Sequence, residues 1–211
     1  MTMQLYCFGE SGHSYKAALG LTLAGIDWAP VYVDFFKGAG RSPEHLARNE
    51  MGECPVLVDG DLTLTQSGVI LDYLSEKTGK FGLQDTAQRR DVWRWVLWDN
   101  HKLSSMLGVT RFMMNFVPED KRPTEVIGWL QGRNKGAYRT LEGALEGREW
   151  LVGNAITAAD ISCCSYLYYP EPFGFDRKDF PNIDRWLDGI AAQPGWKHPY
   201  DLMPRAFPAA A

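Results

Sequence analysis

Apolar and polar residues alternate on both sides of the dipeptide Asp59-Gly60, and this pattern predicts a β-hairpin. The alternating runs cover residues 56–58 and 62–64. An Asp-Gly pair between two such runs is a strong signal for a two-residue turn. Apolar pairs then follow at residues 69–70 and 73–74, which is the spacing of one helix face. The stretch therefore predicts strand, turn, strand and helix in succession.

The residues before this stretch predict a strand, a helix, a second strand and a short helix. A short strand-helix-strand span favours a parallel, right-handed crossover. Ser14 is expected to cap the first helix and Gly25 to end it, while Pro43 suits the first position of the short helix. The expected ranges are a strand over 5–8, a helix from 15 to 24, a strand over 28–33, a glycine-rich loop over 37–41 and a helix over 43–48.

Strand signals nearly vanish after residue 79, and long helical patterns replace them. Residues 80–86 read as a linker between a domain at 1–79 and a helical domain at 87–211. Helices are expected over 87–107 and within 123–146. Thr157 and Asp160 form a capping box, flanked by Ile156 and Ile161 in the positions of a hydrophobic staple. We assign that box a role in folding.

Composition excludes several classes of function. The chain has 211 residues and a formal net charge of −4, which gives no electrostatic case for binding nucleic acid or an anionic membrane. No signal peptide or membrane-spanning run is evident, so a cytoplasmic location is expected. The four cysteines form no CxxC pair and have no metal-like spacing with histidine, so we expect reduced thiols and no metal.

Pro55 stands at the start of an otherwise good strand, where proline needs a structural reason. A cis Cys54-Pro55 bond would leave the backbone of Cys54 facing outward, free to pair with an extended ligand. An ordinary trans proline on an edge strand is the alternative. Ser67 is expected to cap the next helix, whose first free N–H groups form a site for a carboxylate.

The proline before a hairpin, followed by Gln66-Ser67 at a helix start, resembles the soluble glutathione transferases, in the serine-type, bacterial or zeta/theta-like classes. The resemblance extends over essentially the whole chain. It implies an N-terminal thioredoxin-like α/β domain of order β-α-β-α-β-β-α and an all-α C-terminal domain, with a late helix that opens at Pro181. It also implies glutathione as co-substrate.

The resemblance places thiol activation in the loop after the first strand. Glutathione has a thiol pKa near 8.5, and lowering it by about 2 units takes about 2.7 kcal/mol of preferential stabilisation of the thiolate. In the family pattern a serine precedes an aromatic-basic pair, which here is Tyr15-Lys16, so Ser11 falls at the activating position. Ser14 is the rival. His13 stands where the zeta-type isomerase pattern has cysteine.

The resemblance also assigns the other ends of glutathione. Ser67 and Gln66 are expected to hold the γ-glutamyl end and Cys54 the cysteine backbone. The basic residue often found before the proline is replaced by Gly52, so another cation must bind the glycine carboxylate. Arg41 is our choice, with Lys37 and His45 as alternatives.

The electrophile is expected to lie against the helical domain. Bulky side chains there include Trp95, Trp98, Met106, Arg111, Phe112 and Met113, and we take Trp98, Arg111 and His13 as pocket residues. By the resemblance, Asp99 can reach the amine of a glutathione bound to a partner subunit, which implies a homodimer. Tyr6 reads as a strand residue.

The resulting hypothesis is attack of a serine-stabilised glutathione thiolate on a small apolar electrophile. A glutathione-dependent isomerase, dehalogenase or disulfide reductase on the same site is an enzymatic alternative. A non-catalytic binding module that kept the fold is a third reading.

Overall fold

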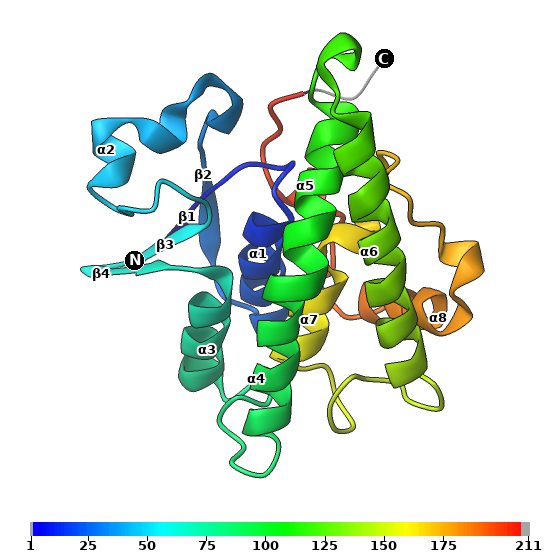
Figure 1. Ribbon diagram of the computed structural model, residues 1–211. Helices are drawn as coiled ribbons and strands as arrows, with labels where there is room; N and C mark the ends of the chain where they lie inside the picture. The colour runs from blue at the N-terminus through cyan, green and yellow to red at the C-terminus, as the bar shows by residue number, and fades with distance from the viewer. Residues whose placement is uncertain (1, 208–211) are drawn as a thin grey trace.

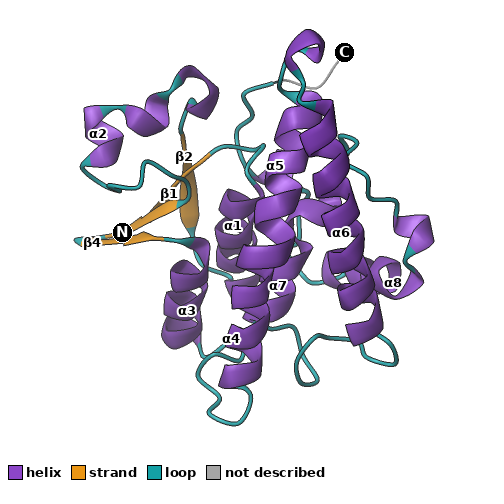
Figure 2. Ribbon diagram, viewed as in Figure 1, coloured by secondary structure: helices purple, strands orange, loops and turns teal. Residues whose placement is uncertain are grey.

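The computed structural model describes residues 2–207, and it sets a small sheet beside a larger group of helices (Figures 1 and 2). Met1 and residues 208–211, which the predicted domains include, lie outside the described residues. No helix in the described part of the chain is both long and apolar enough to cross a membrane.

The sheet has four strands in the order β2-β1-β3-β4. They are β1 (Met3–Cys7), β2 (Trp28–Tyr32), β3 (Val56–Asp59) and β4 (Leu62–Thr65). β1 pairs with β2 in parallel and with β3 in antiparallel fashion, and β3 pairs with β4 across the hairpin. The predicted hairpin and the predicted parallel crossover are both confirmed, but the two-residue turn is Gly60-Asp61 and not Asp59-Gly60, because Asp59 pairs with Leu62.

Helix α1 (Gly12–Ala24) crosses from β1 to β2 and is buried on nearly every side. It lies between α3 (Ser67–Thr78) and the helices of the C-terminal part (Figure 1). A helix surrounded in this way needs an apolar surface on several sides, and the five consecutive residues from Ala17 to Leu21 are apolar and buried. Its first turn is consequently fixed by both halves of the molecule.

Two helix starts differ from the prediction by a few residues. Ser11 caps α1 by accepting a hydrogen bond from the Ser14 N–H (3.1 Å), so the expected cap at Ser14 is wrong. Ser67 is the first residue of α3, and Gln66 occupies the N-cap position with a left-handed φ of 67°. The expected loop at 37–41 contains two 3₁₀ turns, η1 (Phe35–Lys37) and η2 (Ala39–Arg41). Ser42 then caps the short α2 (Pro43–Leu46).

The expected helix over 87–107 is the first part of a longer helical rod. It consists of α4 (Arg89–Trp98), a π-helical turn, η3 (Asp99–Leu103), and α5 (Ser104–Asn115). The ring of Tyr166 packs against Gly108 in the middle of α5. A Cβ there would lie 2.8 Å from the Tyr166 hydroxyl. Gly108 is thus a packing position inside a helix.

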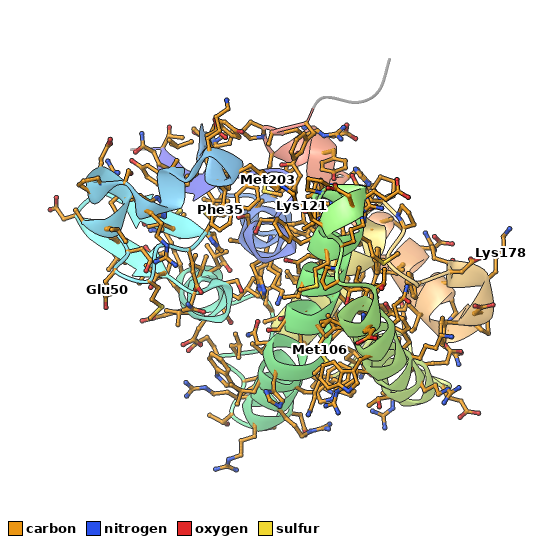
Figure 3. The ribbon with its side chains drawn as sticks, turned by 45° about the horizontal axis from the view of Figure 1, so that its top comes forward. Phe35, Glu50, Met106, Lys121, Lys178 and Met203 are labelled. Carbon is orange, nitrogen blue, oxygen red and sulfur yellow. The ribbon has the colours of Figure 1, made fainter. Side chains whose placement is uncertain are left out.

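The remaining helices complete the C-terminal part. They are η4 (Glu119–Lys121), α6 (Thr124–Ala144), α7 (Ala158–Cys164), η5 (Ser165–Tyr168), η6 (Arg177–Asp179), α8 (Pro181–Ala191) and α9 (Pro199–Leu202). Figure 3 shows Phe35 at the junction of the two halves and Met106 over the α5–α6 pair.

The capping box at the start of α7 is confirmed and ties several segments together. In this box the Thr157 side chain bonds to the backbone of Asp160, and the Asp160 side chain bonds to the backbone of Thr157. The fully buried Asp160 carboxylate also accepts hydrogen bonds from the Leu151 N–H and the Trp186 indole, both at 2.9 Å. Phe81 of the expected linker bridges to Thr157, and its carbonyl accepts from the Ala158 N–H (3.0 Å).

Candidate active site

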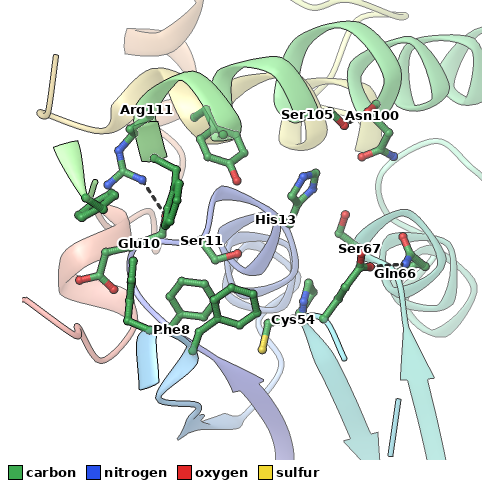
Figure 4. A pocket seen from close by; sticks show the side chains of 18 of the residues that line it. Phe8, Glu10, Ser11, His13, Cys54, Gln66, Ser67, Asn100, Ser105 and Arg111 are labelled. Carbon is green, nitrogen blue, oxygen red and sulfur yellow. Dashed lines mark hydrogen bonds between the residues drawn. The ribbon is translucent and has the colours of Figure 1, made fainter. Parts of the chain in front are cut away.

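A cavity of about 440 Å³ opens between the sheet and the helical rod (Figure 4). It receives side chains from the loop after β1, the Cys54-Pro55 segment, the starts of α1 and α3, and the inner face of the rod. Of the residues proposed from sequence, it brings together Ser11, His13, Cys54, Pro55, Gln66, Ser67, Arg111 and Phe112.

Ser11 lies at the N-terminal end of α1 with a side chain that is 7% exposed. Its oxygen accepts the Ser14 N–H, which leaves the hydroxyl proton free to donate into the cavity. The first N–H groups of an α-helix carry partial positive charge that stabilises an adjacent anion. A thiolate bound here would therefore accept a hydrogen bond from the Ser11 hydroxyl and be stabilised by the partial positive charge at the start of α1.

Ser14 has no exposed surface and does not line the cavity. Its hydroxyl has no hydrogen-bond partner among the described residues. The side chain lies on the buried side of α1, one turn beyond Ser11, and so it has no path to a ligand in the cavity.

His13 is the second residue of α1, and its ring contacts Tyr166 edge to face at 5.7 Å between centroids. Burial, followed by the nearby charge of Lys16, lowers the pKa of His13 to about 3. The imidazole is neutral at physiological pH and can accept or donate a hydrogen bond without carrying charge.

This shift makes folding stability depend on pH. An unfolded histidine binds a proton below about pH 6.5 whereas folded His13 does not, so stability falls as pH falls from about 6.5 towards 3. The slope is up to about 1.4 kcal/mol per pH unit. We expect His13→Gln to flatten the urea-unfolding free energy between pH 4 and 6. An unchanged slope in that variant would show that His13 titrates normally.

Cys54 and Pro55 form one wall of the cavity, and the peptide bond between them is cis, as the sequence predicted. The backbone N–H and carbonyl of Cys54 have no hydrogen-bond partner among residues 2–207. Burial, reinforced by Glu53, raises the pKa of the Cys54 thiol to about 12, so this thiol stays protonated. The segment offers backbone groups to a ligand.

The start of α3 presents a second polar wall. Ser67 is 4% exposed, and no described group bonds to its hydroxyl. Gln66 adopts a backbone conformation that costs non-glycine residues about 1–3 kcal/mol and that clusters at functional sites. Its amide donates to a Glu53 carboxylate oxygen (3.1 Å). The Glu53 carboxylate therefore lies beside the start of α3. This position of Glu53 was not predicted from the sequence.

The cations expected to hold a glycine carboxylate lie outside the cavity. Arg41 is exposed and donates to the Met51 carbonyl (3.3 Å), and Lys37 pairs with Asp34. The buried His45 ring bonds to the Glu53 carbonyl (3.0 Å). None of the three faces the cavity.

Asp99 is placed differently from the expectation that it reaches a partner subunit. Its side chain has no exposed surface and pairs with the equally buried Lys16 at 2.5 Å. Ser104 and Ser162 donate to the same carboxylate. The expectation is wrong because Asp99 forms its ion pair with Lys16 of the same chain and is buried there. The next residue, Asn100, faces the cavity instead.

Arg111 lines the cavity, but its guanidinium is already bound. It donates to the Glu10 carbonyl (2.7 Å) and to Glu171 and Tyr200, and it stacks on Tyr169 at 3.9 Å. Burial would raise the pKa of Glu171, but the hydrogen bond from Tyr200 and the charge of Arg111 lower it. Arg111 thus holds the loop that carries Ser11.

The outer end of the cavity is aromatic. Phe36 contacts Phe112, Phe116 and Phe207 with centroid distances of 6.2, 5.2 and 4.8 Å. Phe8 and Phe35 stack nearby at 4.9 Å. Such a wall suits an apolar group of a ligand.

Tyr166 also lines the cavity and was not foreseen from the sequence. Its ring packs on Gly12 and Gly108, where an added Cβ would come within 2.4 and 2.8 Å of ring or hydroxyl atoms. Burial raises the pKa of Tyr166 to about 12, so the hydroxyl remains a donor.

Trp98 and Met106 line a separate groove between the rod and α6, so they are not part of this cavity. Trp95 is a core residue, 5% exposed.

Comparison with protein-family models identifies the chain. Residues 1–76 match the glutathione S-transferase N-terminal domain, and residues 106–194 match the glutathione S-transferase C-terminal domain. The chain belongs to the glutathione S-transferase family. Its thioredoxin-like sheet and helical C-terminal part are those of this family, as predicted.

Relatives in the glutathione S-transferase family are similar along most of their length. The disulfide-bond oxidoreductase YfcG of Escherichia coli is 29% identical, with 89% of each chain covered. A maleylacetoacetate isomerase of Pseudomonas aeruginosa is 29% identical, with 99% of this chain and 100% of that protein covered. A solved glutathione S-transferase from Xanthobacter autotrophicus superposes with a TM-score of 0.86 at 28% identity, covering 93% and 96% of the two chains.

A further solved structure carries a ligand. The glutathione transferase from Burkholderia graminis holds two glutathione molecules per subunit. It superposes with a TM-score of 0.82 at 28% identity and covers 92% of this chain and 85% of that one.

Proposed function

We propose that this chain binds glutathione in the cavity and activates its thiol for attack on a small apolar electrophile. The observation that carries the proposal is the position of Ser11, a helix-capping serine with a free hydroxyl proton that opens on the same cavity as Cys54 and Ser67. In this arrangement the backbone of Cys54 pairs with the cysteine of glutathione, and Ser11 donates to its thiolate.

The γ-glutamyl end is assigned to the start of α3. Its carboxylate accepts from Ser67 and the first N–H groups of the helix. Its ammonium group is assigned to Glu53, which Gln66 holds beside the helix start. An acid in the same chain thereby takes the role that the sequence reading gave to Asp99.

The electrophile is assigned to the aromatic end of the cavity. Phe36, Phe112 and Phe116 supply apolar contact, and the protonated Tyr166 hydroxyl can donate to charge that develops on the electrophile. Arg111 acts by holding the Ser11 loop.

The decisive experiment is a titration of bound glutathione by the ultraviolet absorbance of its thiolate. The expected result is saturable binding with a thiol pKa about 2 units below the ordinary value of about 8.5. Turnover of a chlorodinitrobenzene should follow the same pH curve. If glutathione does not bind, the chain is a non-catalytic member of its family; binding without a pKa shift would remove the proposed thiol activation.

Disulfide reduction is the second candidate, and similarity to the disulfide-bond oxidoreductase of E. coli favours it. The same thiolate would attack a disulfide sulfur, form a mixed disulfide with glutathione and release the other sulfur as a thiolate; a second glutathione thiolate would then attack the glutathione sulfur, giving glutathione disulfide and the second released thiolate. Isomerase activity is suggested by the full-length similarity to maleylacetoacetate isomerase, although His13 stands in place of the cysteine of that pattern. Rates with a disulfide, a maleyl ketone and an aryl halide will separate the three.

We also propose a homodimer in the cytoplasm. The outer face of the rod and α6 exposes Leu97 (63%) and Trp129 (61%), and Gly128, Gly132 and Gly136 repeat every four residues with open space around them. Residues four apart lie on one helix face, so α6 can approach a second copy closely. The cytoplasmic location rests on four free cysteines.

Trp129→Asp is expected to convert the dimer to a monomer in sedimentation experiments, since it puts a charge in the proposed contact. Tyr32→Asp, an equally large change at an exposed aromatic on edge strand β2, is the matched control and should stay dimeric. A wild-type protein that sediments as a monomer would contradict the proposal.

A further inference from the structure

The π-helical turn in the rod carries Asn100 into the cavity, close to the start of α3 (Figure 4). A π-turn inside an α-helical rod changes which residues face inward, and such turns occur frequently at functional sites. Here Asp99 points into the core and its neighbour Asn100 points towards Ser67 and Gly68. Both halves of the molecule thus meet at this point.

The orientation of the Asn100 amide is fixed by Lys16. The Lys16 ammonium, which has no exposed surface, donates to the Asn100 Oδ1 atom at 3.0 Å and to Asp99 at 2.5 Å. An ammonium group has no acceptor, so the amide oxygen must face Lys16. The NH₂ group then faces the other way. Its nitrogen lies 3.9 Å from the place where a Cβ on Gly68 would stand.

The start of α3 is therefore approached by donors from two directions. On one side are the unbonded hydroxyl of Ser67, a residue that is 4% exposed, and the first N–H groups of the twelve-residue helix. On the other is the Asn100 amide, which has no bond through its nitrogen to another described group. Three donor types that converge on one point match a carboxylate, whose two oxygens accept several hydrogen bonds.

We propose that Asn100 is a binding residue for the α-carboxylate of the γ-glutamyl group, and that Lys16 is the residue that positions it. This inference rests on the proposed function, because it takes glutathione as the ligand. The residues assigned to the carboxylate, Ser67 and Asn100, then come from the two halves of the same chain.

The test compares two ligands with wild type, Asn100→Ala and Asn100→Asp by calorimetric titration. The first ligand is glutathione. The second is 4-aminobutanoyl-cysteinyl-glycine, which is glutathione without the α-carboxylate. We expect Asn100→Ala to weaken glutathione binding about 10-fold and Asn100→Asp about 100-fold, since the second variant adds a negative charge. Both variants should bind the second ligand within about twofold of wild type.

The two-ligand design separates a binding role from a structural one. Equal weakening of both ligands would show that Asn100 only maintains the fold of the rod, and it would overturn the inference. Unchanged glutathione binding in Asn100→Ala would overturn it as well. If wild type binds neither ligand, the failure belongs to the proposed function itself.

Discussion

Glutathione bound to the Ser11→Ala variant is expected to have a thiol pKa near its ordinary value of about 8.5 rather than about 2 units below it. The hydroxyl proton of Ser11 is the donor that the structure leaves free at the start of α1. Hydrogen bonds to charged groups contribute about 1.5–3 kcal/mol, so kcat/KM near pH 7 should fall about 10- to 100-fold.

Two control variants separate this effect from a loss of helix capping. Ser11→Ala also removes the α1 cap, which costs about 1 kcal/mol of stability. Ser42→Ala removes the cap of α2, where Ser42 accepts the His45 N–H at 3.2 Å, and should lose similar stability with an unchanged thiol pKa. Ser14→Ala should leave the thiol pKa unchanged as well. A shift lost only in Ser14→Ala would move the assignment one turn along α1.

Lys16→Met is expected to have the largest effect on stability, a loss of about 3–5 kcal/mol. The substitution leaves the Asp99 carboxylate buried with hydroxyl partners but no countercharge. Breaking a buried ion pair is costly, whereas removing both charges together is often close to neutral. Urea denaturation measures the free energy of unfolding.

The double variant Lys16→Met/Asp99→Asn is the informative control for the ion pair. It removes both charges, so it should recover most of the lost stability. A double variant as unstable as Lys16→Met alone would show that packing of the Lys16 side chain, and not its charge, carries the effect.

Local signals made most of the fold predictable. The Thr157/Asp160 box specifies a helix start through neighbouring residues, and the structure agrees. The alternating runs predict the hairpin correctly, but its two-residue turn is Gly60-Asp61, because Asp59 still pairs with Leu62. The cis bond at Pro55 could be expected because the family motif surrounds it.

The predictions were wrong where contacts between segments far apart in the sequence determine the structure. Ser11 and Ser14 are equally good caps in sequence, and burial of Ser14 against the core selects Ser11. Asp99 is bound to Lys16, 83 positions away, and no periodic pattern reports such a pairing. The Tyr166 ring reaches the cavity because Gly12 and Gly108 have no side chains that would occupy its place. Nothing in the sequence around these two glycines predicts that they contact Tyr166.

Glu10, next to Ser11, binds the end of the described chain. Its carboxylate accepts the backbone N–H groups of Ala206 and Phe207 at 3.0 to 3.1 Å, nearly the full length of the sequence away. The two partners lie 196 and 197 positions after Glu10, so the Ser11 loop reaches its final form only when the first strand and the last described segment have both taken their places.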